Sequence, residues 1–89
     1  MSHTIHDRKS LLNRVRRIKG QIESLERMLE GEAECFSTMQ QTAAVRGAAN
    51  SLMAKVIEGF LEAHLVQKDS VEDRREEAKH LLALLKTYF

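Results

Sequence analysis

The chain has no proline, no tryptophan, one cysteine and only four glycines among its 89 residues. Because proline is the usual interruption of a helix, its absence favours long continuous helices. Aromatic residues make up 4% of the chain, too few to fill the interior of a broad β-sandwich. One cysteine gives no disulfide framework, so a chain of this length needs another source of stability, for which oligomerisation is the remaining route.

Long hydrophobic runs are also missing. No apolar segment approaches the roughly 20 residues of a membrane-spanning helix, and the polar start Met1-Ser2-His3-Thr4 is unlike a signal peptide. The lone cysteine then indicates a reduced thiol. It has no glycine-rich oxyanion loop or evident histidine partner in one protomer, so an enzyme is not expected. We expect one domain, residues 1–89, in the cytoplasm.

Hydrophobic residues recur at helical spacing in three segments. The pattern Thr4-Ile5-His6-Asp7 has the form of a capping box, and Gly31 is a natural helix stop. Together they predict a helix over about residues 5–30. Its apolar seam alternates between spacings of four and three, through Leu11, Val15, Ile18, Ile22, Leu25 and Leu29.

A second helix is predicted over about residues 34–66. Its seam consists of Met39, Thr42, Val45, Ala49, Leu52, Val56 and Phe60. Ser70-Val71-Glu72-Asp73 again has the form of a capping box and begins a third helix over about residues 70–87. The expected fold class is therefore all-α, with a three-helix protomer.

Cys35 and His64 open and nearly close the second predicted helix. They would lie roughly 43 Å apart but, after about eight turns, on the same side. If that side packs against a second copy in antiparallel fashion, Cys35 of one protomer meets His64 of the other. The helices would cross near residue 49 or 50, where Ala43–Ala49 allows close approach. This predicts a four-helix-bundle dimer with two identical sites across its two-fold axis.

The net charge of +1 hides an asymmetry along the chain. Most charged residues in the segment 23–34 are acidic. In the segment 8–19 all the charged residues are basic: Arg8, Lys9, Arg14, Arg16, Arg17 and Lys19. A basic strip is either a solvated helix face or a contact for nucleic-acid phosphates. A helical self-assembly module without DNA binding is the alternative class of function.

No helix-turn-helix, zinc finger or basic zipper is present, so any DNA would be recognised mostly through its backbone and shape. The predicted DNA contacts are Lys9, Arg14, Arg16, Arg17, Lys19 and Arg46. The polar side chains that could add specific contacts are Gln21, Gln40, Gln41 and Asn50.

The residues that could hold a metal are few. Taken singly, Cys35 could be an inert thiol, His64 an ordinary polar residue of a helix and His3 a residue of a flexible arm. Removal of Met1 would leave a free amine on Ser2 next to His3. The combined donors suit Ni(II), Co(II) or Zn(II); the predicted ligands are Ser2, His3, Cys35 and His64.

Three motifs resemble the CsoR/RcnR/FrmR family of bacterial transcriptional repressors. They are the segment Arg14–Ile22, the pair Glu34-Cys35, and the segment Gln40–Asn50, which contains Ala43-Ala44-Val45-Arg46-Gly47-Ala48-Ala49. The resemblance covers the whole chain. It implies a helical protomer, an antiparallel dimer that pairs into a homotetramer, and repression by the unliganded form. An effector at the cysteine site between protomers would release an efflux or detoxification gene.

Within that family, the branches differ in the effector that the resemblance implies. The chain is similar to the nickel/cobalt branch at Ser2, His3, Cys35 and His64, but Phe60 stands where that branch has a ligand histidine. The missing ligand favours a site of lower coordination number. In the formaldehyde branch, a methylene bridge joins the N-terminal amine, here of Ser2, to Cys35. The copper branch needs a second cysteine, which this chain lacks. A divalent metal is the expected effector, and formaldehyde is the alternative.

Overall fold

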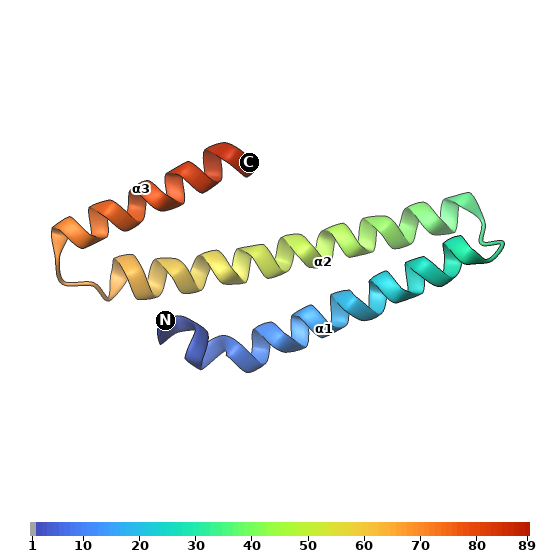
Figure 1. The fold of residues 1–89 in the computed structure, drawn as a ribbon, viewed down its shortest axis with the longest axis horizontal. Coiled ribbons are helices and arrows are strands. Elements are labelled where there is room, and N and C mark those ends of the chain that lie inside the picture. Colours follow the sequence, from blue (N-terminus) through green and yellow to red (C-terminus); the bar gives the residue numbers. More distant parts are fainter. Residues whose placement is uncertain (1) are drawn as a thin grey trace.

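The computed structural model describes the backbone of residues 2–89 and the side chains of residues 7–89. Its elements are α1 (Ser2–Glu30), α2 (Cys35–Leu61), the π-helix η1 (Glu62–Val66) and α3 (Val71–Tyr88). α1 and α2 form a long antiparallel hairpin, and α3 turns back along one side of α2 (Figure 1). The expected all-α, three-helix protomer is confirmed.

The first helix begins earlier than expected. α1 starts at Ser2, so Thr4 lies inside the helix and the predicted capping box at Thr4–Asp7 is wrong. His3 likewise belongs to the first turn of α1 and not to an arm before it. No proline or glycine interrupts residues 2–7, and their intrinsic preferences tolerate a helix. α1 ends at Glu30, where the Gly31 N–H donates to the Arg27 carbonyl at 3.0 Å.

The second helix begins at Cys35, with the extended residue Glu34 before it, and changes character near its end. From Glu62 to Val66 the backbone forms one wider π-turn, closed by the Gln67 N–H donating to the Glu62 carbonyl at 3.0 Å. Such turns are rare and often occur at functional sites. Because a wider turn rotates less per residue, the predicted phase match between Cys35 and His64 becomes approximate.

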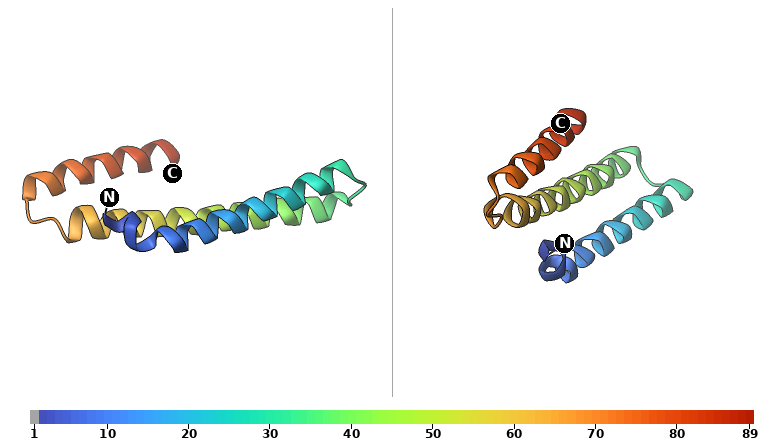
Figure 2. Two further views of the ribbon diagram at one scale, coloured as in Figure 1. Left: turned by 60° about the horizontal axis from the view of Figure 1, so that its bottom comes forward. Right: turned by 60° about the vertical axis from the view of Figure 1, so that its left-hand side comes forward.

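The third helix begins as its capping box predicts. Ser70 is extended, and its hydroxyl accepts a hydrogen bond from the Asp73 N–H at 3.2 Å. Glu72 and Asp73 lie in the first turn and Lys86 in the last, which complements the helix dipole at both ends. Two further views show α3 standing to one side of the α1–α2 hairpin (Figure 2).

Only part of the predicted seam of α1 faces α2. The half-buried positions recur every three or four residues: Leu11, Arg14, Ile18, Gln21, the adjacent pair Ser24 and Leu25, and Met28. Two polar links join this stripe to α2: Arg14 Nη1 donates to Ser51 Oγ at 2.8 Å, and Gln41 Nε2 donates to the Gln21 carbonyl at 3.0 Å. Val15, Ile22 and Leu29, also predicted in the seam, are exposed.

Residues 7–89 form no closed core. No hydrophobic side chain among residues 7–89 is buried; of the residues whose burial is described, Gly59 alone is. The radius of gyration is 17.3 Å, whereas a compact domain of this length would have about 12 Å. The described helices include none that is long and apolar enough to cross a bilayer. Much apolar surface is thus left for another molecule to cover.

Candidate functional site

Cys35 is the first residue of α2, and its free thiol is exposed. It lies at one end of a shallow hollow of about 360 Å³. The nearby hydroxyls of Thr38 and Thr42 donate to backbone carbonyls of their own helix, at 3.2 and 2.8 Å. The hollow is lined by Cys35, Thr38, Met39, Thr42, Ala43 and Arg46.

His64 lies at the other end of the same long helix, within the π-turn. Its side chain is only 13% exposed, and its Nδ1 is 3.2 Å from Oε2 of Glu77 on α3. The ring of Phe60 lies against the imidazole, with centroids 4.7 Å apart and planes inclined by 34°. Phe60 is therefore beside His64, as their spacing of one helical turn predicts.

A second hollow, of about 150 Å³, lies next to His64 between α2 and α3. Its lining is almost wholly apolar: Met53, Val56, Ile57, Phe60, His80, Leu81 and Leu84. At about 100° per residue, Thr42, Met53 and Phe60 all point within about 20° of the direction of Cys35 around α2. Both hollows therefore lie on one face of this helix. We call this the Cys35 face.

Within one protomer, Cys35 and His64 occupy opposite ends of this face. Among the described side chains, no three His, Cys, Asp or Glu residues are grouped closely enough to hold a metal ion. Ser2 and His3, the other predicted ligands, lie outside the residues whose side chains are described. A thiolate and an imidazole suit borderline divalent metals, but here they could share one ion only across two protomers.

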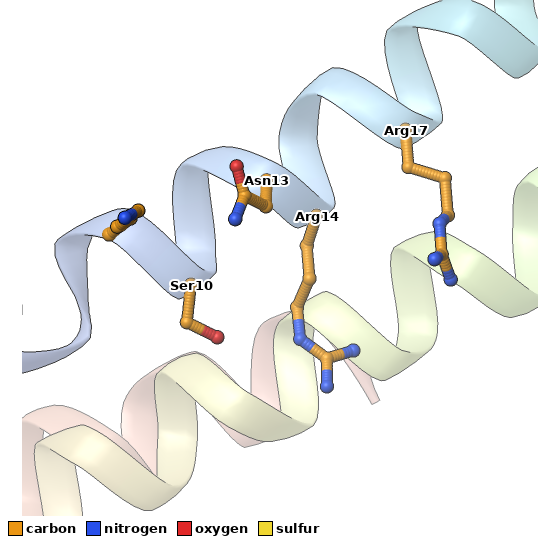
Figure 3. A pocket seen from close by; sticks show the side chains of 5 residues that line it. Ser10, Asn13, Arg14 and Arg17 are labelled. Carbon is orange, nitrogen blue, oxygen red and sulfur yellow. The ribbon is translucent and has the colours of Figure 1, made fainter.

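A basic groove of about 500 Å³ runs along α1 and is lined by Lys9, Ser10, Asn13, Arg14 and Arg17. Arg14 and Arg17 extend from α1 in the same direction, across α2, with Ser10 and Asn13 on the neighbouring turn (Figure 3). Arg14 is held by Ser51, yet its guanidinium has five N–H donors, so others remain available. Three cations and two neutral polar side chains can bind successive phosphate oxygens.

The other predicted DNA contacts are distributed differently. Arg16 and Lys19 are exposed on α1 but do not line the groove, and Arg46 lines the hollow at Cys35 instead. Gln40 and Asn50 are exposed, whereas Gln21 and Gln41 are half-buried and link α1 to α2. The structure therefore brings three of the six predicted cations into one groove.

The groove and the Cys35 face lie on opposite sides of the hairpin. Ser51, which binds Arg14, is about 160° from Cys35 around α2 at 100° per residue. On α1, the exposed apolar residues lie roughly opposite the groove by the same count: Leu12, Val15, Ile22 and Leu29. One side of the hairpin carries the basic groove, and the other is apolar with Cys35 at its edge.

Two residues at these sites were not predicted from the sequence. Ser51 gives no signal of its own, because its contact with Arg14 depends on how α1 packs against α2. Glu77 does give a weak one: it is four residues before Leu81, on the stripe by which α3 faces α2, where an acid is unexpected.

Comparisons with known proteins agree on one group. A family profile described as "Metal-sensitive transcriptional repressor" matches residues 7–87. An uncharacterized protein from the bioA 5′ region of Serratia marcescens is 53% identical over 89 residues, covering 99% of this chain and 98% of that one. The transcriptional repressor RcnR of Salmonella typhimurium is 42% identical over 88 residues, with the same coverage.

A solved structure is similar as well. It is a variant, with histidine in place of a glutamate, of the formaldehyde-responsive regulator FrmR from Salmonella enterica serovar Typhimurium. The two chains superpose with a TM-score of 0.87 and 44% sequence identity, over 94% of this chain and 96% of that one. The RcnR and FrmR relatives are thus about equally similar to this chain.

Proposed function

Because the chain belongs to the family of metal-sensitive transcriptional repressors, we propose that an effector bound between Cys35 and His64 of two protomers releases it from its DNA operator. A transcriptional repressor is a DNA-binding regulator and not an enzyme. Family membership also argues against the alternative of a self-assembly module without DNA binding. Acting on an operator would place the protein in the cytoplasm.

The observation that carries this proposal is the pair of hollows on the Cys35 face. Placing Cys35 against the partner's His64 in antiparallel order also sets one hollow against the other. The opposed pairs are then Met39 with Phe60, Thr42 with Ile57, Ala43 with Val56, and Arg46 with Met53. A two-fold axis repeats every contact, so one pairing would complete two effector sites.

The lack of a core among residues 7–89 supports the same assembly. Since no described hydrophobic side chain is buried in the protomer, a stable protein needs a partner surface. The exposed apolar residues of α1 lie on the same side of the hairpin as Cys35, which would give a four-helix bundle with the basic grooves outward. Two such dimers would make the homotetramer that the family resemblance implies.

The basic groove is the proposed contact with DNA, through Lys9, Arg14 and Arg17. Arg16 lies beside it on α1, and Lys19 lies farther round the helix, on the same face as Leu12. Its position on the far side of the hairpin leaves it open when the Cys35 face is covered. Arg46 is better placed for the protomer interface, because it lines the hollow that contains Cys35.

A divalent metal is the first choice of effector. The proposed ligands are the Ser2 amine, His3, Cys35 and His64, and the ion would be nickel, cobalt or zinc. The support is the donor chemistry of a thiolate and an imidazole, and the description of the family as metal-sensitive. Phe60 adds an apolar wall beside His64 and no ligand.

Formaldehyde is the second candidate, favoured by the likeness to the FrmR variant. It would bridge the Ser2 amine and the Cys35 thiolate by a methylene group, with loss of one water molecule. With either effector, binding at Ser2 would move α1. The cations of the basic groove would move with it, since all of them belong to α1. A hundredfold loss of DNA affinity needs only about 2.7 kcal/mol of differential binding.

The test is a DNA-binding titration with reduced, metal-free protein. The DNA is the promoter of the operon adjacent to the gene that encodes this chain. Release by Ni(II), Co(II) or Zn(II), lost in Cys35→Ala and in His64→Ala but kept in the control His80→Ala, is the expected result. Release by formaldehyde alone, lost in Cys35→Ala and kept in His64→Ala, would replace the metal by the aldehyde. A full response in Cys35→Ala would refute the proposed site.

A further inference from the structure

The helix α3 meets η1, the π-turn that follows α2, through a half-buried polar contact. Glu77 Oε2 is 3.2 Å from Nδ1 of His64, and the two side chains are 25% and 13% exposed. The second oxygen of Glu77 faces His80, whose Nδ1 is 3.7 Å away and whose side chain is 69% exposed. The carboxylate of Glu77 therefore lies between two imidazoles. That of His64 is largely buried between η1 and α3, and that of His80 is at the surface.

The imidazole of His64 is constrained from two directions. Phe60 packs against the ring at 4.7 Å, and Glu77 holds one edge of it. The backbone beneath the ring is the π-turn of η1, which fixes where the side chain leaves the helix. Because Nδ1 faces a carboxylate oxygen at hydrogen-bond distance, the proton of the neutral ring is best placed on Nδ1.

We propose that Glu77 is a positioning residue of the effector site. By accepting a hydrogen bond from Nδ1–H of His64, it selects the tautomer whose Nε2 carries the lone pair, the nitrogen that would bind the metal of the proposed site. Histidine ligands commonly donate their other N–H to a carboxylate, which orients the ring and makes it more basic. The metal-binding part of this inference rests on the proposed function; the tautomer does not.

The neighbouring acid offers a matched control. Glu76 is on the same helix but is exposed, and its carboxylate pairs at 3.4 Å with Lys79 of its own helix. Removing Glu76 changes the charge of α3 as much as removing Glu77 does, without touching His64. A difference between the two variants therefore reports on the contact with the ring and not on net charge.

The first experiment measures the tautomer directly. In the metal-free full-length chain, with ¹⁵N-labelled histidine and at a pH where the ring is neutral, His64 should show a protonated Nδ1 and an unprotonated Nε2. His64→Gln assigns the signals. Glu77→Ala should move the equilibrium towards the Nε2–H tautomer, and Glu76→Ala should leave it unchanged. An Nε2–H tautomer in the unmodified chain, or no change in Glu77→Ala, would overturn the proposal.

The second experiment measures affinity for Co(II) by competition with a chelator. Glu77→Ala should weaken binding by about 10- to 100-fold, while Glu77→Gln, whose amide oxygen can still accept the hydrogen bond, should lose less. The DNA affinity of metal-free Glu77→Ala should equal that of the unmodified chain. A change in it would indicate that the substitution had unfolded α3. Unchanged Co(II) affinity in Glu77→Ala, with a large loss in His64→Ala, would refute the positioning role. No loss in His64→Ala would refute the proposed metal site, and the tautomer would still be decided by the first experiment.

Discussion

At the scale of single residues, the basic groove contains one cation whose position is fixed by the fold. Arg14 donates to Ser51 at 2.8 Å, so its guanidinium is held across the hairpin before any ligand arrives. Ordering a long side chain in advance lowers the entropy lost on binding. Arg17 extends in the same direction one turn later, which sets two guanidinium groups along one line (Figure 3).

The groove predicts different effects for two cations of the same helix. Arg17→Ala should weaken DNA binding and lower the slope of log affinity against log salt by about one for each protomer in contact, since a phosphate contact is lost. Lys19→Ala, outside the groove, should change both less. The measurement is DNA affinity at several salt concentrations. Equal effects of the two substitutions would mean that the whole exposed strip, and not the groove, contacts DNA.

At the scale of elements, α3 is held by the cap at its N-terminus and by one contact with η1. Its start is fixed by the Ser70 cap, and the contact between Glu77 and His64 fastens it to η1. Val71, Leu82 and Tyr88 remain exposed along it. A helix with so little buried surface gains much of its stability from its cap and from whatever it meets in the assembly.

Loss of the cap should therefore be felt in α3 specifically. Ser70→Ala removes the acceptor for the Asp73 N–H and should cost about 1 kcal/mol. Faster amide hydrogen exchange is expected in α3, with α1 and the first half of α2 unaffected. Thr87→Ala is the control, because that hydroxyl only donates to the Ala83 carbonyl within the same helix. Exchange in α3 that Ser70→Ala leaves unchanged would show that packing, and not the cap, holds the helix.

Features encoded in local sequence could be predicted, and features set by packing could not. Gly31 and Ser70 mark helix ends because their chemistry acts on adjacent backbone groups. The π-turn at Glu62–Val66 has no such local signature. The seam of α1 was only half right: spacing shows that Ile18 and Ile22 belong to an apolar stripe, but not that the first faces α2 while the second is exposed.

The candidate site follows the same division. Cys35 at the start of α2 and Phe60 beside His64 depend on spacing within one helix, and both could be anticipated. Glu77 and Ser51 act on residues of another helix, so their roles appear only once the helices are placed. At Thr4 a local pattern gave a wrong prediction. Its sequence has the form of a capping box, but α1 extends back to Ser2, so Thr4 lies inside the helix.

At the scale of the whole molecule, the hairpin separates two kinds of surface. The groove side is polar and carries the cations of the groove, whereas the Cys35 side exposes apolar residues from both long helices. A slab only 14 Å thin along its shortest dimension cannot bury that side against itself. If a second copy covers it, effector and DNA would bind on opposite sides of one layer of two helices, and α1 would belong to both.

This arrangement predicts which substitution should break the assembly. Met39 is 57% exposed in the protomer but opposes the partner's Phe60 in the proposed dimer. Met39→Lys should place a charge in that apolar contact, since burying an unpaired charge is strongly unfavourable. Sedimentation should then show dissociation, and circular dichroism a loss of helix, because residues 7–89 bury no hydrophobic side chain within the protomer. Gln40→Lys, about 100° away around α2, should leave the assembly intact. Dissociation in Gln40→Lys with none in Met39→Lys would mean that the protomers meet through a different face of α2.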